Sequence, residues 1–164
     1  MNIREMMTSP AITVTTDTAI QEVARLMSTE LISGVPVVNT NGGLEGVITE
    51  LHLIVRNAPL KEPQYIAVLS GLIPIHLSEH RAYKERLRQA LATTAGELMD
   101  STDIATLSPD DKVDQAMTIM SNPENTMIPI VEHGAVVGVV TRTDLVRLIE
   151  RLEGRLEETT EGLT

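Results

Sequence analysis

The stretch VVGVVTRTD, residues 136–144, decides the fold, because it joins a strand to the start of a helix. Its glycine-broken run of valines is typical of a short buried strand. If a helix begins where this strand ends, Thr141 and Asp144 share its first turn, beside the partly positive end of the helix. A hydroxyl and a carboxylate at that place can accept hydrogen bonds from a vicinal diol such as a ribose. The alternative is structural, since both residue types are also favoured there as helix caps.

The composition predicts a folded protein with an aliphatic core. Of the 164 residues 42% are apolar, yet only two are Tyr and none is Phe or Trp. The absence of cysteine excludes disulfides, thiolate metal sites and cysteine nucleophiles. A net charge of −10 argues against nucleic acid as a partner. Because no apolar run approaches 18 residues and the amino terminus resembles no signal peptide, a cytoplasmic protein with no membrane partner is expected.

The same unit occurs twice along the chain. Two amphipathic helices carry apolar residues with the same phase at a constant offset of 93, namely Ile20, Val23, Ala24 and Met27 in the first unit and Val113, Ala116, Met117 and Met120 in the second. After a hairpin that is one residue shorter in the second unit, Thr141 matches Thr49. The match fails at the next position of interest, where Asp144 corresponds to His52.

Each unit is predicted to run strand–helix–strand–strand–helix. The short first strands are expected at residues 11–14 and 104–107. The first helix should be capped by Thr16 or Asp17, and its counterpart should open at Pro109. Such a unit cannot bury its sheet and its helices alone, so we expect an α/β (α+β) fold in which two repeats pack about a pseudo-twofold axis.

The two units resemble tandem cystathionine-β-synthase (CBS) domains, the pair known as a Bateman module. The matching segments are IREMM and GELMD, SGVPVV and MIPIV before the hairpins, and GVIT and GVVT with the following TxxD of the second unit. The resemblance implies that an adenosine compound (AMP, ADP, ATP or S-adenosylmethionine) binds in a cleft between the repeats. It implies no required cofactor and no catalytic residue.

The resemblance divides the chain into four parts: repeat 1 at 1–56, a helical insertion at 57–93, repeat 2 at 94–150, and a helix extension and tail at 151–164. Within the insertion we expect one short helix with irregular packing, followed by a helix capped by Ser78. The last helix is expected to fray beyond Glu157.

The resemblance also implies a set of site residues in repeat 2. Thr141 and Asp144 would hold the ribose, and four residues would offer backbone groups and apolar walls to an adenine: Ile104, Ala105, Met127 and Ile128. Arg142 and His133 are the nearest basic candidates in sequence for the phosphates, with Arg147 more distant. In repeat 1 a neutral imidazole at His52 cannot accept from two hydroxyls as a carboxylate does. One nucleotide per chain is therefore expected.

The segment HLSEH, residues 76–80, spells the H-x-x-E-H motif of one zinc peptidase class. A helix cap at Ser78 would put His76 ahead of the helix and spoil the spacing with His80. We therefore expect no metal site, although a metal-binding protein remains a distant alternative.

Two function classes remain open. The first is a non-enzymatic adenine-nucleotide sensor that changes shape and contacts an unknown protein partner, and the second is a ligand-free structural or oligomerisation module. A homodimer is expected in either case, through apolar helix faces that include Leu53, Ile54, Leu145, Ile149 and Leu152.

Overall fold

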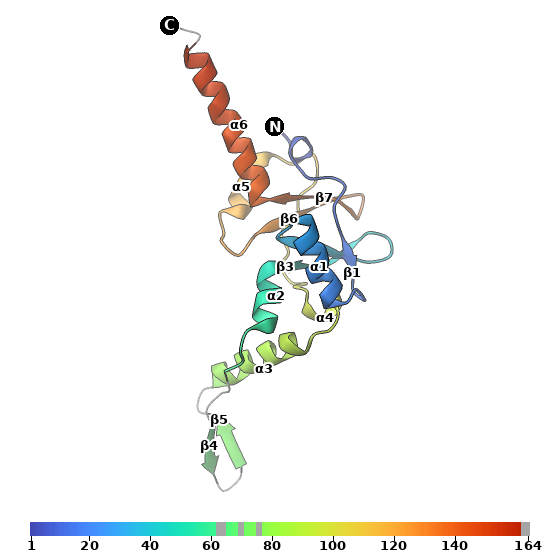
Figure 1. The fold of residues 1–164 in the computed structure, drawn as a ribbon, viewed down its shortest axis with the longest axis vertical. Helices are drawn as coiled ribbons and strands as arrows, with labels where there is room; N and C mark the ends of the chain where they lie inside the picture. The colour runs from blue at the N-terminus through green and yellow to red at the C-terminus, as the bar shows by residue number, and fades with distance from the viewer. Residues whose placement is uncertain (62–64, 69–70, 75–76, 162–164) are drawn as a thin grey trace.

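The computed structural model describes residues 1–61, 65–68, 71–74 and 77–161 (Figure 1). Repeat 1 contains the 3-10 turn η1 (Ile3–Glu5), β1 (Val14–Thr15), α1 (Ile20–Glu30), β2 (Gly34–Val38), β3 (Leu44–Thr49) and α2 (Glu50–Asn57). Repeat 2 contains α4 (Ala95–Leu98), α5 (Val113–Met120), β6 (Met127–Glu132), β7 (Ala135–Thr141) and α6 (Arg142–Glu161). The elements therefore follow the predicted order in repeat 1, and in repeat 2 from its first long helix onward, with differences at several boundaries.

Each repeat has its own sheet built on a hairpin, and the two sheets differ in their first strand. In repeat 1, β1 pairs in parallel with β2, and β2 pairs antiparallel with β3. In repeat 2, β6 and β7 form the hairpin, while the strand expected at residues 104–107 is reduced to one parallel bridge between Leu107 and Ile130. Both hairpins shift register at equivalent places, between Val37 and Val38 and between Ile130 and Val131.

The short turn at the start of each repeat packs into the core of the other repeat. Ile3 and Met6 lie among the buried residues of repeat 2, and Ala95 and Leu98 lie among those of repeat 1. Backbone hydrogen bonds fix both exchanges: the Ile3 N–H donates to the Asp111 carbonyl at 2.9 Å, and the Ala95 N–H donates to the Thr18 carbonyl at 2.8 Å. Neither repeat thus has a complete core of its own.

After each exchanged turn, the chain forms two further backbone hydrogen bonds with the second hairpin strand of the opposite repeat. Thr8 and Val139 exchange two backbone hydrogen bonds of 2.9 and 3.0 Å, and Asp100 and Val47 exchange two of 2.9 Å. A glycine precedes the partner strand residue in each case. A Cβ at Gly138 would lie 2.9 Å from the Thr8 carbonyl oxygen, and one at Gly46 would lie 2.8 Å from that of Asp100. The close approach of the two backbones therefore requires glycine at both positions.

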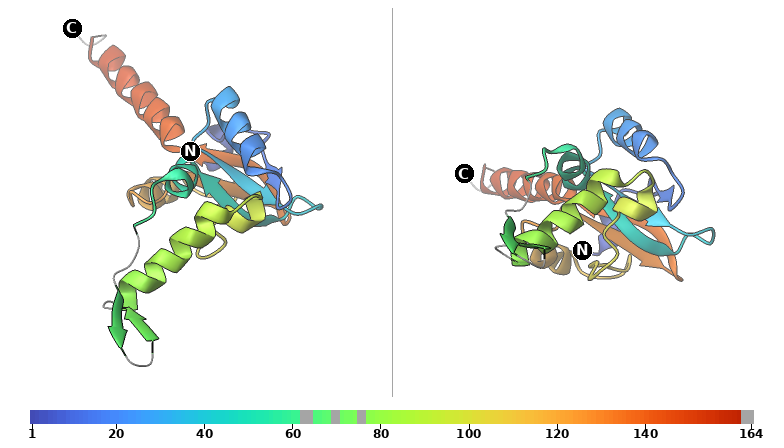
Figure 2. Two further views of the ribbon diagram at one scale, coloured as in Figure 1. Left: turned by 60° about the horizontal axis from the view of Figure 1, so that its bottom comes forward. Right: turned by 90° about the horizontal axis from the view of Figure 1, so that it is seen from below.

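The insertion contains a hairpin that the sequence pattern did not predict. The strands β4 (Tyr65–Val68) and β5 (Gly71–Pro74) pair antiparallel where one short helix was expected, and α3 (Leu77–Leu91) follows. Apolar and β-branched residues on both sides of a glycine favour such a hairpin over a helix. The arm formed by α3 and the hairpin, and the helix α6, leave the body at opposite ends (Figures 1 and 2).

Several helix boundaries differ from the expectation. The caps of α1 and α5 are Ala19 and Lys112, so neither Thr16 nor Asp17 caps α1, and α5 begins four residues after Pro109. Ser78 lies inside α3 rather than at its cap, and α6 continues through Glu161 without a break at Glu157. None of the helices within the described residues is both long and apolar enough to cross a membrane.

Candidate functional site

Thr141 and Asp144 meet at the first turn of α6, as the sequence predicted. One carboxylate oxygen of Asp144, Oδ2, accepts from the Thr141 N–H at 2.8 Å and from the Thr141 hydroxyl at 2.7 Å. In return, the Asp144 N–H donates to the Thr141 hydroxyl oxygen at 3.4 Å, so the two residues form a capping box. Asp144 is only 7% exposed, and it is the one buried charged residue among the described side chains.

Asp144 lines a hollow of about 560 Å³, and its second oxygen, Oδ1, accepts no hydrogen bond from the helix cap. Its contact among the described residues is the guanidinium of Arg147, whose Nη1 lies 3.9 Å from Oδ1. Residues of α6 and of the N-terminal segment line the hollow: Glu5, Met6, Met7, Thr8, Asp144, Arg147, Glu150 and Arg151. Two arginines therefore stand on the same wall as the carboxylate, within the first three turns of α6.

His52 forms the same box at the start of α2 with different chemistry. Its Nδ1 accepts from the Thr49 N–H at 3.0 Å, so this nitrogen carries no hydrogen, and the proton of the neutral ring belongs on Nε2. Burial lowers the pKa of His52, and the nearby Asp100 carboxylate opposes that shift only in part. The ring is therefore held neutral, and its second nitrogen is a donor where Asp144 offers an acceptor.

A pocket of about 260 Å³ beside His52 contains three of the four residues proposed as adenine walls. Its lining combines repeat 1 with repeat 2: Val47, Thr49, Leu51, His52, Asp100, Thr102, Asp103, Ile104, Ala105, Glu124, Asn125, Thr126 and Met127. The fourth, Ile128, is fully buried in the core of repeat 2. The expectation that these walls surround Thr141 and Asp144 is thus not what the structure shows.

The exchange of starting segments explains this division. Because Asp100 pairs with Val47, the chain after it passes beside the start of α2 and brings Ile104 toward His52. The same exchange pairs Thr8 with Val139 and brings the N-terminal segment beside Asp144. Each cleft is therefore built from the capping box of one repeat and a wall of the other, which the sequence of either repeat alone does not reveal.

The two basic residues that lie nearest in sequence and were predicted for the phosphates, Arg142 and His133, lie elsewhere. Arg142 donates through Nη2 to the carbonyls of Pro123 and Asn122 at 2.6 and 3.3 Å. His133 occupies the turn between β6 and β7, about 20 Å along the hairpin from Thr141 at 3.3 Å per residue. Arg147, the more distant candidate, lines the Asp144 hollow together with Arg151, which was not predicted. Their spacing from Asp144 along one helix, three and seven residues, was a usable signal.

The HLSEH segment is only partly described, because His76 lies outside the described residues. His80 is half-buried in the first turns of α3. Among the residues that the structure describes, no group of three or more His, Asp or Glu side chains is arranged to hold a metal ion.

Comparison with known proteins identifies the family. The CBS domain model matches residues 3–57 and 95–151. The chain is 30% identical over 155 residues to the uncharacterized protein MJ1426 of Methanocaldococcus jannaschii, and the alignment covers 91% of each protein. The sequence similarity to this relative therefore extends over nearly the full length of both proteins.

Two solved structures share the fold. One is CBSX2 of Arabidopsis thaliana in complex with AMP, with a TM-score of 0.73, 16% identity, and coverage of 92% of this chain and 97% of that chain. The other is the CBS domain pair of protein MJ0100 in complex with 5′-methylthioadenosine and S-adenosyl-L-methionine, with a TM-score of 0.65, 23% identity, and coverage of 92% and 96%. With two matches to the family model in tandem, the chain belongs to the CBS domain family and forms a Bateman module.

Proposed function

We propose that this Bateman module binds one adenosine compound in the cleft at Asp144 and acts as a regulatory sensor without chemistry of its own. The observation that carries the proposal is the buried Asp144 carboxylate, which uses one oxygen for the helix cap and lines a hollow together with two arginines. Two CBS pairs of the same fold have been crystallised with adenosine compounds, which supports this ligand class.

The carboxylate has enough acceptor capacity for both tasks. Two donors from Thr141 occupy Oδ2, whereas a carboxylate offers about four lone-pair positions. The vicinal hydroxyls of a ribose would donate to the remaining ones, and each such charge-assisted bond contributes roughly 1.5–3 kcal/mol. Arg147 and Arg151 would meet the phosphates of AMP, ADP or ATP.

The symmetry of the two repeats indicates which residues would form the adenine-facing wall of this cleft. Ile104 and Met127 line the His52 pocket, and their counterparts in repeat 1 are Ile12 at an offset of 92 and Gly34 at an offset of 93. These two residues would therefore face the adenine in the Asp144 cleft. Ile104, Ala105 and Met127 would serve the His52 pocket, whose described lining includes three carboxylates and no lysine or arginine.

The second candidate function is a structural module that binds no ligand. The capping box favours it, because the bonds to Thr141 already explain why an acidic residue occupies position 144. His52 closes the equivalent box with a neutral ring, so the cap alone does not require a carboxylate. The two candidates therefore differ in what the charge of Asp144 does.

The variant Asp144→Asn separates them, because an amide oxygen still accepts from Thr141 while the charge is lost. A thermal-shift panel of AMP, ADP, ATP and S-adenosylmethionine would identify the ligand on the unmodified chain. We expect Asp144→Asn to weaken its binding by about 2–4 kcal/mol, at least thirtyfold, and a 2′-deoxyribose analogue to bind more weakly to the unmodified chain only. If no adenosine compound shifts the unmodified chain, the structural module is the better account.

The regulatory part of the proposal concerns shape rather than reaction. Binding in a cleft lined by both repeats would change how they pack, and a protein partner of unknown identity would respond to that change. The two-copy assembly expected from the sequence belongs to the same proposal.

A further inference from the structure

Acidic as well as basic side chains line the hollow at Asp144. Glu5 at the end of η1 and Glu150 on α6 line it together with Asp144, Arg147 and Arg151. Three carboxylates and two guanidinium groups leave this lining with one more negative than positive charge. A ligand with several negative charges therefore meets more repulsion than attraction from the charged groups of the hollow.

The countercharge of the two arginines is partly used within the protein. Arg147 Nη1 lies 3.9 Å from Asp144 Oδ1, so its charge offsets that carboxylate. Arg151 donates through Nε to the carbonyl oxygen of Arg147 at 3.4 Å, and this neutral acceptor leaves the charge of Arg151 in place. Among the described contacts, the guanidinium of Arg151 is thus the positive charge that remains available to a ligand.

Glu5 keeps its negative charge beside the hollow because a hydrogen bond holds its carboxylate. Its Oε1 accepts from the Asn2 N–H at 2.7 Å, as part of the capping box of η1. The other acidic residue, Glu150, lies three residues after Arg147, on the same side of α6. Beyond Asp144 itself, the hollow therefore has a carboxylate on each of the two segments that line it.

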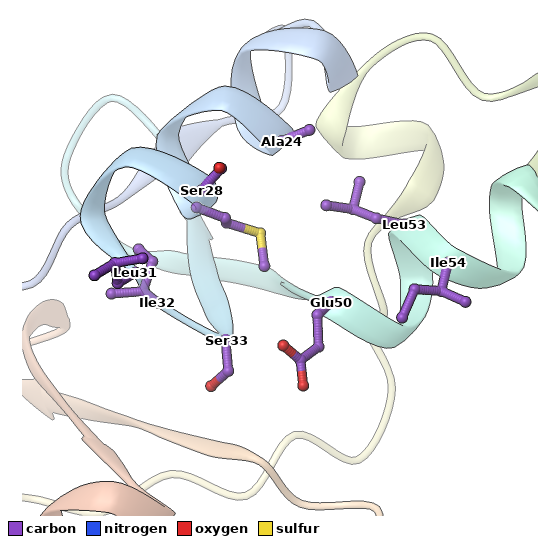
Figure 3. Close-up of a pocket in the computed structure, with 9 residues that line it drawn as sticks. Ala24, Ser28, Leu31, Ile32, Ser33, Glu50, Leu53 and Ile54 are labelled. Carbon is purple, nitrogen blue, oxygen red and sulfur yellow. The ribbon is translucent and has the colours of Figure 1, made fainter.

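A groove between α1 and α2 provides a comparison within repeat 1 (Figure 3). This groove of about 470 Å³ is lined mainly by apolar residues such as Leu53 and Ile54, and Glu50 is the one ionisable residue in its described lining. Without an arginine or lysine in that lining, the groove has no counterion for a phosphate. Mixed charge therefore distinguishes the Asp144 hollow from an apolar hollow of similar size.

We propose that the Asp144 cleft selects among adenosine compounds by the charge of their 5′ substituent, and that Glu5 and Glu150 disfavour those with more than one phosphate. This inference rests on the proposed function and specifies its ligand. AMP brings one phosphate, which Arg151 can meet, whereas each further phosphate of ADP and ATP adds negative charge beside the two glutamates. S-adenosylmethionine carries no phosphate, and its ammonium and carboxylate groups match a lining with both signs of charge.

Calorimetric titration of AMP, ADP, ATP and S-adenosylmethionine into the unmodified chain, at low ionic strength and without magnesium, tests the order. We expect AMP to bind at least about threefold more tightly than ADP, and ADP more tightly than ATP, with differences that shrink as salt is added. S-adenosylmethionine should bind more tightly than ATP. ADP or ATP binding as tightly as AMP overturns the inference and leaves the proposed function standing, whereas no binding of any of the four overturns both.

Glutamine variants test the two residues to which the selection is assigned. Glu5→Gln retains an acceptor for the Asn2 N–H and removes the charge, and Glu150→Gln removes a charge from the exposed side of α6. Each should raise the affinity for ATP by at least about threefold and change the affinity for AMP less. The control Glu30→Gln removes one exposed carboxylate at the end of α1, outside the hollow, and should leave the order unchanged. Unchanged ATP affinity in both hollow variants, or an equal gain in Glu30→Gln, contradicts the assignment.

Discussion

The helices α6 and α2 begin with the same capping box, except that the residue three positions after the threonine is Asp144 in repeat 2 and His52 in repeat 1. This difference distinguishes the role of the residue as a helix cap from its role in the cleft. Asp144 and His52 both accept the backbone N–H of the threonine at the helix start, at 2.8 and 3.0 Å. Both residues therefore satisfy the same backbone donor. Toward the cleft they are opposite, because Asp144 offers a second charged acceptor and His52 offers an N–H donor.

The surroundings of the two residues differ in the same sense. The Asp144 hollow contains Arg147 and Arg151, whereas the pocket of about 260 Å³ beside His52 contains Asp100, Asp103 and Glu124 without a lysine or arginine among its described residues. His52 also lines a second pocket, which corresponds to the Asp144 hollow and contains Glu85 and Arg88. The Asp144 hollow therefore has two arginines, whereas the corresponding hollow at His52 has one, Arg88, which is paired with Glu85 at 2.6 Å. The two repeats thus share one backbone arrangement and differ chemically at a few positions in their clefts.

The largest expected effect on stability tests whether the close backbone contacts at Gly46 and Gly138 are equally important in the two repeats. Gly46→Ala and Gly138→Ala each place a Cβ within 3 Å of a backbone oxygen of the exchanged segment. Each should lower the free energy of unfolding by about 1–3 kcal/mol, the usual cost of overpacking. Urea denaturation of both variants measures it. A loss in one variant without the other would mean that the two contacts are not equivalent.

A smaller effect should come from removing the caps. Asp144→Ala and His52→Ala each leave a threonine N–H without its partner, at a cost of about 1–2 kcal/mol of unfolding free energy. Asp144→Asn and His52→Gln retain an acceptor and should cost much less. Thermal or urea unfolding of the four variants decides this. Equal losses in the Ala and the amide variants would contradict the capping role.

The smallest effect is a pH dependence that only repeat 1 should show. Because burial lowers the pKa of His52, the unfolded chain takes up a proton below about pH 6.5 while the folded chain does not. This contribution to stability is complete above that pH and is lost as the pH falls toward the lowered value, by at most about 1.4 kcal/mol per pH unit.

The variant His52→Gln isolates this term, since glutamine keeps the cap and does not titrate. Stability curves between pH 5 and 8 should differ between the unmodified chain and His52→Gln, and the exposed His133→Gln should follow the unmodified chain. Parallel curves for His52→Gln and the unmodified chain would mean that the ring titrates normally in the folded state.

The sequence predicted the repeats well because apolar periodicity reports local structure. The offset of 93 between Ile20 and Val113 correctly paired α1 with α5, and the TxxD spacing placed Asp144 beside Thr141. The paired motifs also indicated the CBS family, which the match of the family model to both repeats confirms.

The distribution of residues between clefts could not be predicted in the same way. Periodicity does not reveal that η1 and α4 cross to the opposite repeat, and this exchange is what brings Ile104 beside His52. The direction of a long side chain could not be predicted either. Arg142, which lies next to Thr141 in sequence, donates to the carbonyl of Pro123 and not to the cleft. The hairpin of β4 and β5 was missed because a short apolar run with prolines fits several local structures.

The most direct test of the central claim is calorimetric titration of the best ligand from the AMP, ADP, ATP and S-adenosylmethionine panel into three proteins. The account predicts one molecule per chain for the unmodified protein and for His52→Gln, with equal affinity, and at least thirtyfold weaker binding to Asp144→Asn. Two molecules per chain, or binding that survives in Asp144→Asn and is lost in His52→Gln, would contradict it.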